Sequence, residues 1–111
     1  MSTQAFTRLG NTVAFVANTS APTPVQAAGS TLGANQYRVV NKGATMVFLG
    51  VGATAADATS AALVVTAASA APAIPIMGSS TEVITALPNA YFTGITESGS
   101  GTVFITPGDG L

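Results

Sequence analysis

The sequence predicts an all-β domain, a small jelly roll or β-sandwich of about eight short antiparallel strands. The first observation behind this prediction is that 12 Gly and 6 Pro fall between short runs rich in Val, Ile, Thr, Phe and Tyr. The second is the period of two in the apolar and polar residues of several runs. The third is length, since 111 residues without a visible repeat or linker predict one domain over residues 1–111.

Nine runs separated by turn residues have the composition of strands. In chain order they are residues 12–18, 23–27, 37–42, 45–51, 61–66, 73–77, 81–87, 90–95 and 102–106. Pro22 and Pro24 lie at the second run. Because proline cannot donate a ladder hydrogen bond, we expect an extended N-terminal arm or an edge strand within residues 1–36.

The third and fourth runs differ in their polarity. In residues 37–42 the two cations, Arg38 and Lys42, share one side of the strand and apolar residues share the other, which predicts a half-exposed antiparallel strand. Residues 45–51 are apolar on both sides, so that strand is expected to be central in a sandwich or covered by another chain. The turn at residues 41–44 contains Asn and Gly, which predicts a tight hairpin between the two strands.

Residues 52–71 favour two structures at once. Their alanines favour a helix, whereas β-branched residues such as Val64 and Val65 favour a strand or a loop. We expect a loop followed by a strand over residues 61–66, with a short helix as the alternative. Residues 73–77 are then the next strand.

Turn residues also separate the last three runs. The Pro-Asn pair at residues 88–89 predicts a turn that joins residues 81–87 and 90–95 in a second hairpin. The Ser-Gly-Ser-Gly stretch at residues 98–101 predicts a flexible connection into residues 102–106.

Two aromatic positions stand out from the alternating pattern. In residues 102–106, Phe104 lies on the side of the strand that otherwise carries threonines. Tyr91 and Phe92 are neighbours in one strand and point to opposite sides of it. We therefore expect one of these two aromatic side chains to be exposed or at an interface.

Charge is scarce in this chain. Charged residues form 6% of it, with three cations, four carboxylates and a formal net charge of -1, against about 25% charged residues in typical domains. A neutral surface of this kind is suited to dense packing in an assembly. Three scattered cations disfavour binding to nucleic acid and to anionic membranes, and we expect neither as a partner. No segment is uninterrupted and apolar enough to predict a transmembrane helix.

The residues needed for common catalytic sites are missing. The chain has no His and no Cys, which excludes Ser-His-Asp and Cys-His nucleophile systems and thiolate metal sites. No Gly-rich phosphate-binding motif and no calcium-binding loop is present. We therefore expect no enzyme activity, no catalytic residue, no cofactor and no metal. The four carboxylates are expected to be isolated and solvated; they are Asp57, Glu82, Glu97 and Asp109.

The order of strands and turns over residues 37–110 resembles that of small structural proteins of tailed bacteriophages, and above all of capsid decoration (cement) proteins. The segments that carry the resemblance are YRVVNKGATMVFLG at 37–50, IPIMGS at 74–79, AYFTGI at 90–95 and GTVFITPGDG at 101–110. This resemblance implies a jelly-roll or β-sandwich module on the outside of a phage head that bridges major capsid proteins. The first 36 residues do not take part in it.

The expected function is therefore a structural role in a virion, in many copies or as a homo-oligomer, with the major capsid protein as the partner. No signal peptide is recognised in residues 1–11, which fits assembly in the host cytoplasm. Because charge is scarce, we expect binding that salt weakens little. The alternative is a phage tail, fibre or glycan-binding β-module. The candidate interface residues are Phe6, Arg8, Pro22, Pro24, Tyr91 and Phe92.

Overall fold

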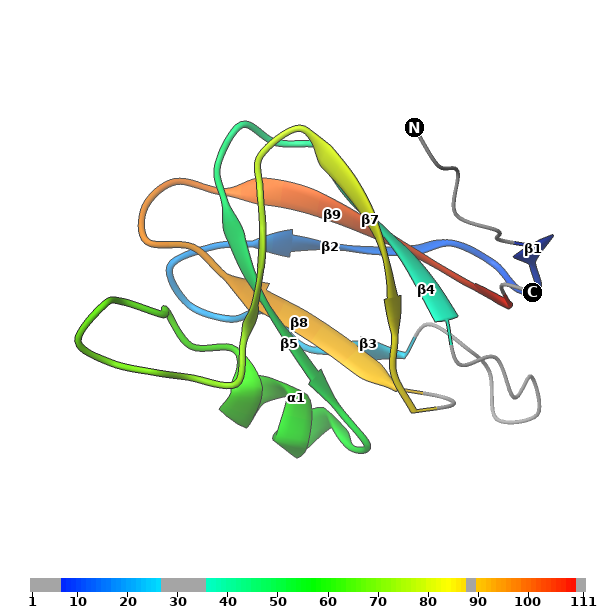
Figure 1. The fold of residues 1–111 in the computed structure, drawn as a ribbon, viewed down its shortest axis with the longest axis horizontal. Coiled ribbons are helices and arrows are strands. Elements are labelled where there is room, and N and C mark those ends of the chain that lie inside the picture. The colour runs from blue at the N-terminus through cyan, green and yellow to red at the C-terminus, as the bar shows by residue number, and fades with distance from the viewer. Residues whose placement is uncertain (1–6, 27–35, 88–89, 110–111) are drawn as a thin grey trace.

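The computed structural model describes residues 7–26, 36–87 and 90–109, and within them it contains two antiparallel sheets and one short helix (Figure 1). Sheet A consists of β1 (Thr7–Arg8), β2 (Val13–Ala17), β4 (Gln36–Asn41), β7 (Ser80–Thr85) and β9 (Gly101–Asp109). Sheet B consists of β3 (Val25–Gln26), β5 (Val47–Gly52), β6 (Ile74–Ile76) and β8 (Tyr91–Ile95). The predicted all-β fold class is confirmed.

The strand order is that of a jelly roll. In sheet A the order is β2-β9-β4-β7, and β1 continues the edge formed by β2 along the same side of β9. In sheet B the order is β3-β8-β5-β6. Most strands that follow each other in the chain therefore lie in different sheets, which stack to enclose the core.

Both predicted hairpins are wrong for this reason. The turn at residues 41–44 joins β4 of sheet A to β5 of sheet B, so the two strands do not pair. β7 and β8 likewise lie in different sheets, and the Pro-Asn pair between them lies outside the described residues. The residues that favour a tight turn serve equally well at a corner between two sheets, and burial of both sheets against each other decides between these uses.

Asn41 holds the first of these corners in place. Its side chain is buried, and its Nδ2 donates hydrogen bonds to the carbonyl oxygens of Thr45 at 2.8 Å and Ile76 at 3.3 Å. Its Oδ1 accepts a hydrogen bond from the backbone N–H of Gly43 at 3.1 Å. The buried amide of Asn41 thus supplies hydrogen-bond partners to backbone groups of the corner and of β6. Backbone groups can be buried only when they have such partners.

The predicted strand over residues 61–66 is also wrong. The chain instead forms a short helix, α1 (Ala55–Ala61), whose last residue is the first of the predicted strand. Thr54 begins the helix as its N-cap, and its Oγ1 accepts a hydrogen bond from the N–H of Asp57 at 3.1 Å. In residues 62–73 the structure shows only an isolated bridge between Thr66 and Ser69. The edge of β5 that a further strand would need is occupied by β6.

α1 lies on the outer side of sheet B, over β5 (Figure 1). Two glycines make this close approach feasible: a Cβ added at Gly50 would lie 2.3 Å from the carbonyl oxygen of Ala58, and one at Gly52 would lie 2.5 Å from the Ala58 nitrogen. Phe48, on the same side of β5, is buried. The strand predicted to be apolar on both sides is therefore central in its sheet and covered by the chain's own helix.

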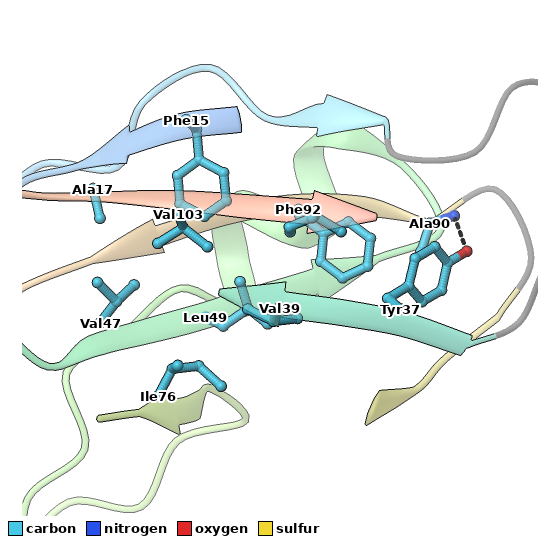
Figure 2. Packing of buried hydrophobic residues seen from close by; sticks show 11 residues of the cluster. Phe15, Ala17, Tyr37, Val39, Val47, Leu49, Ile76, Ala90, Phe92 and Val103 are labelled. Atoms are coloured by element: carbon cyan, nitrogen blue, oxygen red, sulfur yellow. Dashed lines mark hydrogen bonds between the residues drawn. The ribbon is translucent and has the colours of Figure 1, made fainter. Parts of the chain in front are cut away.

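The core lies between the sheets, and Tyr37 of β4 contacts Phe92 of β8 across it (Figure 2). The two ring centroids are 4.8 Å apart in an edge-to-face arrangement. The Tyr37 hydroxyl donates to the carbonyl oxygen of Leu87 at 2.9 Å and accepts from the N–H of Ala90 at 3.3 Å. Tyr37 thus fixes the two ends of the β7–β8 connection to β4.

Other predictions about single strands are confirmed. β4 buries Tyr37 and Val39 and exposes Arg38, as its alternation predicts. β3 is shorter than the run predicted at residues 23–27, but it is an edge strand of sheet B, as expected from its prolines. The two-residue strand β1 was not predicted, because two residues are too few to show a period.

Candidate interaction surface

The described residues contain neither a pocket nor a group of three or more metal-ligating side chains. Of the four carboxylates expected to be isolated, the side chain of Asp109 is not among those described, and the other three lie apart from one another. Asp57 is on α1, Glu82 is on β7, and Glu97 is in the connection between β8 and β9. All three are exposed, so the surface is the part of the molecule where a function can be sought.

The outer sides of the two sheets differ in what covers them. The outer side of sheet B carries α1, which packs on β5 and β8. No element in the described part of the chain packs on the outer side of sheet A. We call this uncovered side, formed by the outward-facing residues of sheet A together with Lys42, the open face.

The strand register identifies the apolar residues of the open face. Residues directly opposite each other in neighbouring strands point to the same side of a sheet. Phe104 of β9 lies opposite Ala14 of β2 and Val40 of β4, and Val40 lies opposite Thr81 of β7. An apolar row that ends in a threonine thus crosses the whole sheet. Val16, at one margin of this face, leaves 52% of its surface exposed.

Threonines and one glutamine supply the neutral polar groups of the open face. Thr106 lies opposite Arg38 in the next row, and its Oγ1 is 2.7 Å from that of Thr12. Hydroxyl groups of this kind can donate and accept hydrogen bonds without carrying charge. The remaining polar neighbours on this face are Gln36, Thr81, Thr85 and Thr102.

All three cations of the chain lie on the open face. Arg38 points outward from β4 and is exposed. Lys42 follows β4 directly, and its N–H donates to the Thr102 carbonyl oxygen at 2.9 Å, so the register and the alternation extend to it. Arg8 lies opposite Gly108, which in turn lies opposite Gln36 on the outer side of β4. The face is therefore apolar, rich in threonine and positively charged.

The candidate residues named from the sequence are distributed over both sheets. Arg8 belongs to the open face, and Phe6 lies outside the described residues. Pro22 and Pro24 are half-buried beside β3 of sheet B, where the Pro22 carbonyl oxygen accepts from Thr93 Oγ1 at 2.9 Å.

The two neighbouring aromatic residues of β8 separate as their alternation predicts. Tyr91 is half-buried on the outer side of sheet B. Phe92 is fully buried in the core, so it cannot contact a partner of the folded domain.

Arg38, Val40 and Phe104 were not among the candidate interface residues named from the sequence. The signal was present, because Val40 and Phe104 are apolar residues on the sides of their strands that carry cations or threonines. Each was a local exception to the alternation. That the two exceptions lie opposite each other follows only from the pairing of β4 with β9.

Comparison with known proteins gives no family for this chain, since no protein-family model, curated protein or solved structure matches it. Among the described residues, no helix has the length and apolar character required to cross a membrane. The chemistry of the open face is therefore the basis for inferring what the domain does.

Proposed function

We propose that this domain is a non-catalytic structural module that binds the outside of a bacteriophage capsid by its open face. There it bridges neighbouring major capsid proteins and stabilises the shell. One observation carries the proposal: α1 covers the outer side of sheet B, whereas no element of residues 7–26, 36–87 and 90–109 covers the outer side of sheet A, which has apolar residues across four strands. A contiguous apolar surface on a small domain is typical of an interaction site.

The size of the open face supports attachment in many copies. A typical stable interface uses about 20–30 residues on each side, and the outward-facing residues of five short strands are fewer than that. One such contact is weak. A repetitive shell offers many equivalent sites. When a module bridges two neighbouring subunits, its second contact forms at a high effective concentration, so two weak contacts together give firm attachment.

The scarcity of charge supports the same role. Copies attached to one shell lie close to each other, and like charges on their flanks would repel. With a formal net charge of -1 and 6% charged residues, the domain tolerates such crowding. The resemblance of residues 37–110 to capsid decoration proteins agrees with this arrangement.

The test is cosedimentation of the purified domain with expanded, undecorated phage shells. We expect saturable binding, with a fixed number of copies per shell. Val16→Glu places a charge on the open face, and we expect it to lower the affinity by about tenfold or more. Leu63→Glu is the matched control, because Leu63 follows α1 and is 48% exposed, against 52% for Val16. The proposal is wrong if the domain does not bind shells, or if the two variants lose affinity equally.

A further inference from the structure

We infer that the open face selects an acidic partner surface, one on which Asp or Glu side chains are set among apolar residues. This inference rests on the proposed docking role of the open face and names the chemistry of its partner. It follows from the distribution of the few charges of the chain, because the fold brings all three cations to one face and turns Glu82 and Asp57 away from it.

The separation of charge is produced by strand pairing. Arg8, Arg38 and Lys42 all lie on the open face, although 34 positions separate Arg8 from Lys42 in the sequence. Asp57 lies on α1, at the opposite side of the sandwich. Glu97 lies in the β8–β9 connection. The open face is therefore positive, although the formal net charge of the chain is -1.

Of the three carboxylates whose side chains are described, Glu82 is the one that belongs to sheet A, and the register turns it away from the open face. It belongs to β7, one strand from Arg38, but it lies opposite Val39, whose side chain is in the core. Its neighbours Thr81 and Val83 occupy the outer side. Arg38 consequently faces Val83 and Thr106 across the two neighbouring strands, and neither offers a charge.

The cations of the open face are available to a partner. In the part of the chain that the structure describes, no hydrogen bond or ion pair holds the Arg38 guanidinium, and the Arg8 guanidinium donates from Nη1 to the carbonyl oxygen of Gly10 at 3.1 Å. Val40 and Phe104 lie beside Arg38 on the same face. Apolar neighbours exclude water when a partner covers them, and arginine in such surroundings is a frequent centre of binding energy.

The arrangement fits a protein better than a nucleic acid. Arg38 and Lys42 are four residues apart on one strand, about 13 Å at the strand rise, which exceeds the screening length of about 8 Å in physiological salt. Each cation therefore acts separately. A phosphate backbone offers no apolar counterpart to Val16, Val40 and Phe104, and it is bound by clustered cations. A folded acidic surface offers both a carboxylate and an apolar neighbour.

The test compares two variants of equal net charge. Replacing all three cations by glutamine, as Arg8→Gln, Arg38→Gln and Lys42→Gln, removes three positive charges from the open face and changes the net charge from -1 to -4. The matched control adds three negative charges to exposed positions of α1, as Ala56→Glu, Thr59→Glu and Ser60→Glu, and also reaches -4. All six positions are exposed, so both variants are expected to fold, which thermal unfolding checks.

The probes are immobilised random copolymers of Glu with Tyr and of Lys with Tyr, a short single-stranded DNA, and the undecorated shells. We expect the natural chain to be retained on the Glu–Tyr copolymer and to ignore the Lys–Tyr copolymer. We also expect it to bind less tightly as NaCl is raised, which replaces the weak salt dependence expected from the scarcity of charge alone, because the fold gathers the three cations on one face. The glutamine variant is expected to bind the Glu–Tyr copolymer and the shells about tenfold more weakly. The α1 variant is expected to bind as the natural chain does.

The outcomes separate this inference from the proposed function. If the shells bind the natural chain and the glutamine variant equally, the inference is overturned and the capsid role stands. Retention on the Glu–Tyr copolymer without any binding to shells supports the acidic partner and overturns the capsid role. No retention on the copolymer, or tighter binding to the DNA than to the copolymer, overturns the inference.

Discussion

Gly50 is the position where one added methyl group is expected to disturb the fold most directly. A Cβ at this position would lie 2.3 Å from the carbonyl oxygen of Ala58, 2.7 Å from the nitrogen of Ala62 and 2.8 Å from its Cβ. The first two are backbone atoms of α1 and of its C-cap residue, and the third is the methyl group of Ala62, which cannot change rotamer to avoid the contact. Gly50→Ala therefore requires the helix to move away from β5 by about an ångström, since ordinary van der Waals contacts begin near 3.4 Å.

The cost follows from the kind of contact that is lost. Overpacking of a closely packed site costs about 1–3 kcal/mol, and displacement of α1 also loses its close contact with Gly52 of the same strand. We expect Gly50→Ala to lower the free energy of unfolding by about 2–3 kcal/mol. At about 4–8 °C per kcal/mol for a domain of this size, the midpoint of thermal unfolding falls by roughly 10–20 °C.

Urea and thermal unfolding followed by circular dichroism measure this change, with Gly101→Ala as the control. A Cβ at Gly101 meets its nearest atom, Asn41 Oδ1, at 3.4 Å, so the same methyl group is expected to cost much less there. Hydrogen exchange of the α1 amides checks that the helix is what has loosened. Equal stability of the two variants within about 0.5 kcal/mol would refute the close seating of α1 on β5.

Three further changes test the corners and the edge of the sandwich. Asn41→Ala removes three hydrogen bonds from a buried corner, and we expect it to lower the free energy of unfolding in urea by about 2–4 kcal/mol. The control is Asn18→Ala, because Asn18 is exposed and its Oδ1 accepts a single hydrogen bond, from Thr19. An equal loss of stability in the two variants would contradict the role of Asn41 at the corner. Tyr37→Phe keeps the ring but leaves the Leu87 carbonyl oxygen and the Ala90 N–H without their hydroxyl partner. We expect it to lower the free energy of unfolding by about 1–2 kcal/mol in the same assay. Unchanged stability would show that this hydroxyl is not needed. Glu82→Val removes a charge from β7, the edge strand of sheet A in the described residues, at a position on the same side of the sheet as Val39. Because charges on edge strands hinder pairing with another molecule, we expect this variant to self-associate more in sedimentation velocity. Sedimentation identical to that of the natural chain would contradict this.

The local sequence pattern was sufficient to predict the fold class and to tell the buried side of a single strand from its exposed side. Glycine and proline separate β-rich runs, and a period of two tells the buried side of β4 from the side with Arg38. Local pattern was insufficient at residues 55–61, where alanine content, a threonine cap and two facing glycines on β5 together produced a helix. The glycines act only through the packing of α1 on β5, so their effect does not show in the composition of residues 52–71.

The sequence by itself determined that the chain is all-β, where most strands lie, that charge is scarce and that the residues of common catalytic systems are missing. Only the tertiary structure decided which strands pair, that residues 41–44 turn a corner between sheets, and that Arg8, Arg38 and Lys42 share one face of sheet A. The physical reason is that alternation assigns a residue to one of two sides of its own strand, a local property of the backbone. Which sides of different strands form one surface depends on hydrogen-bonded register between segments far apart in sequence, and that register is chosen by burial of the shared core.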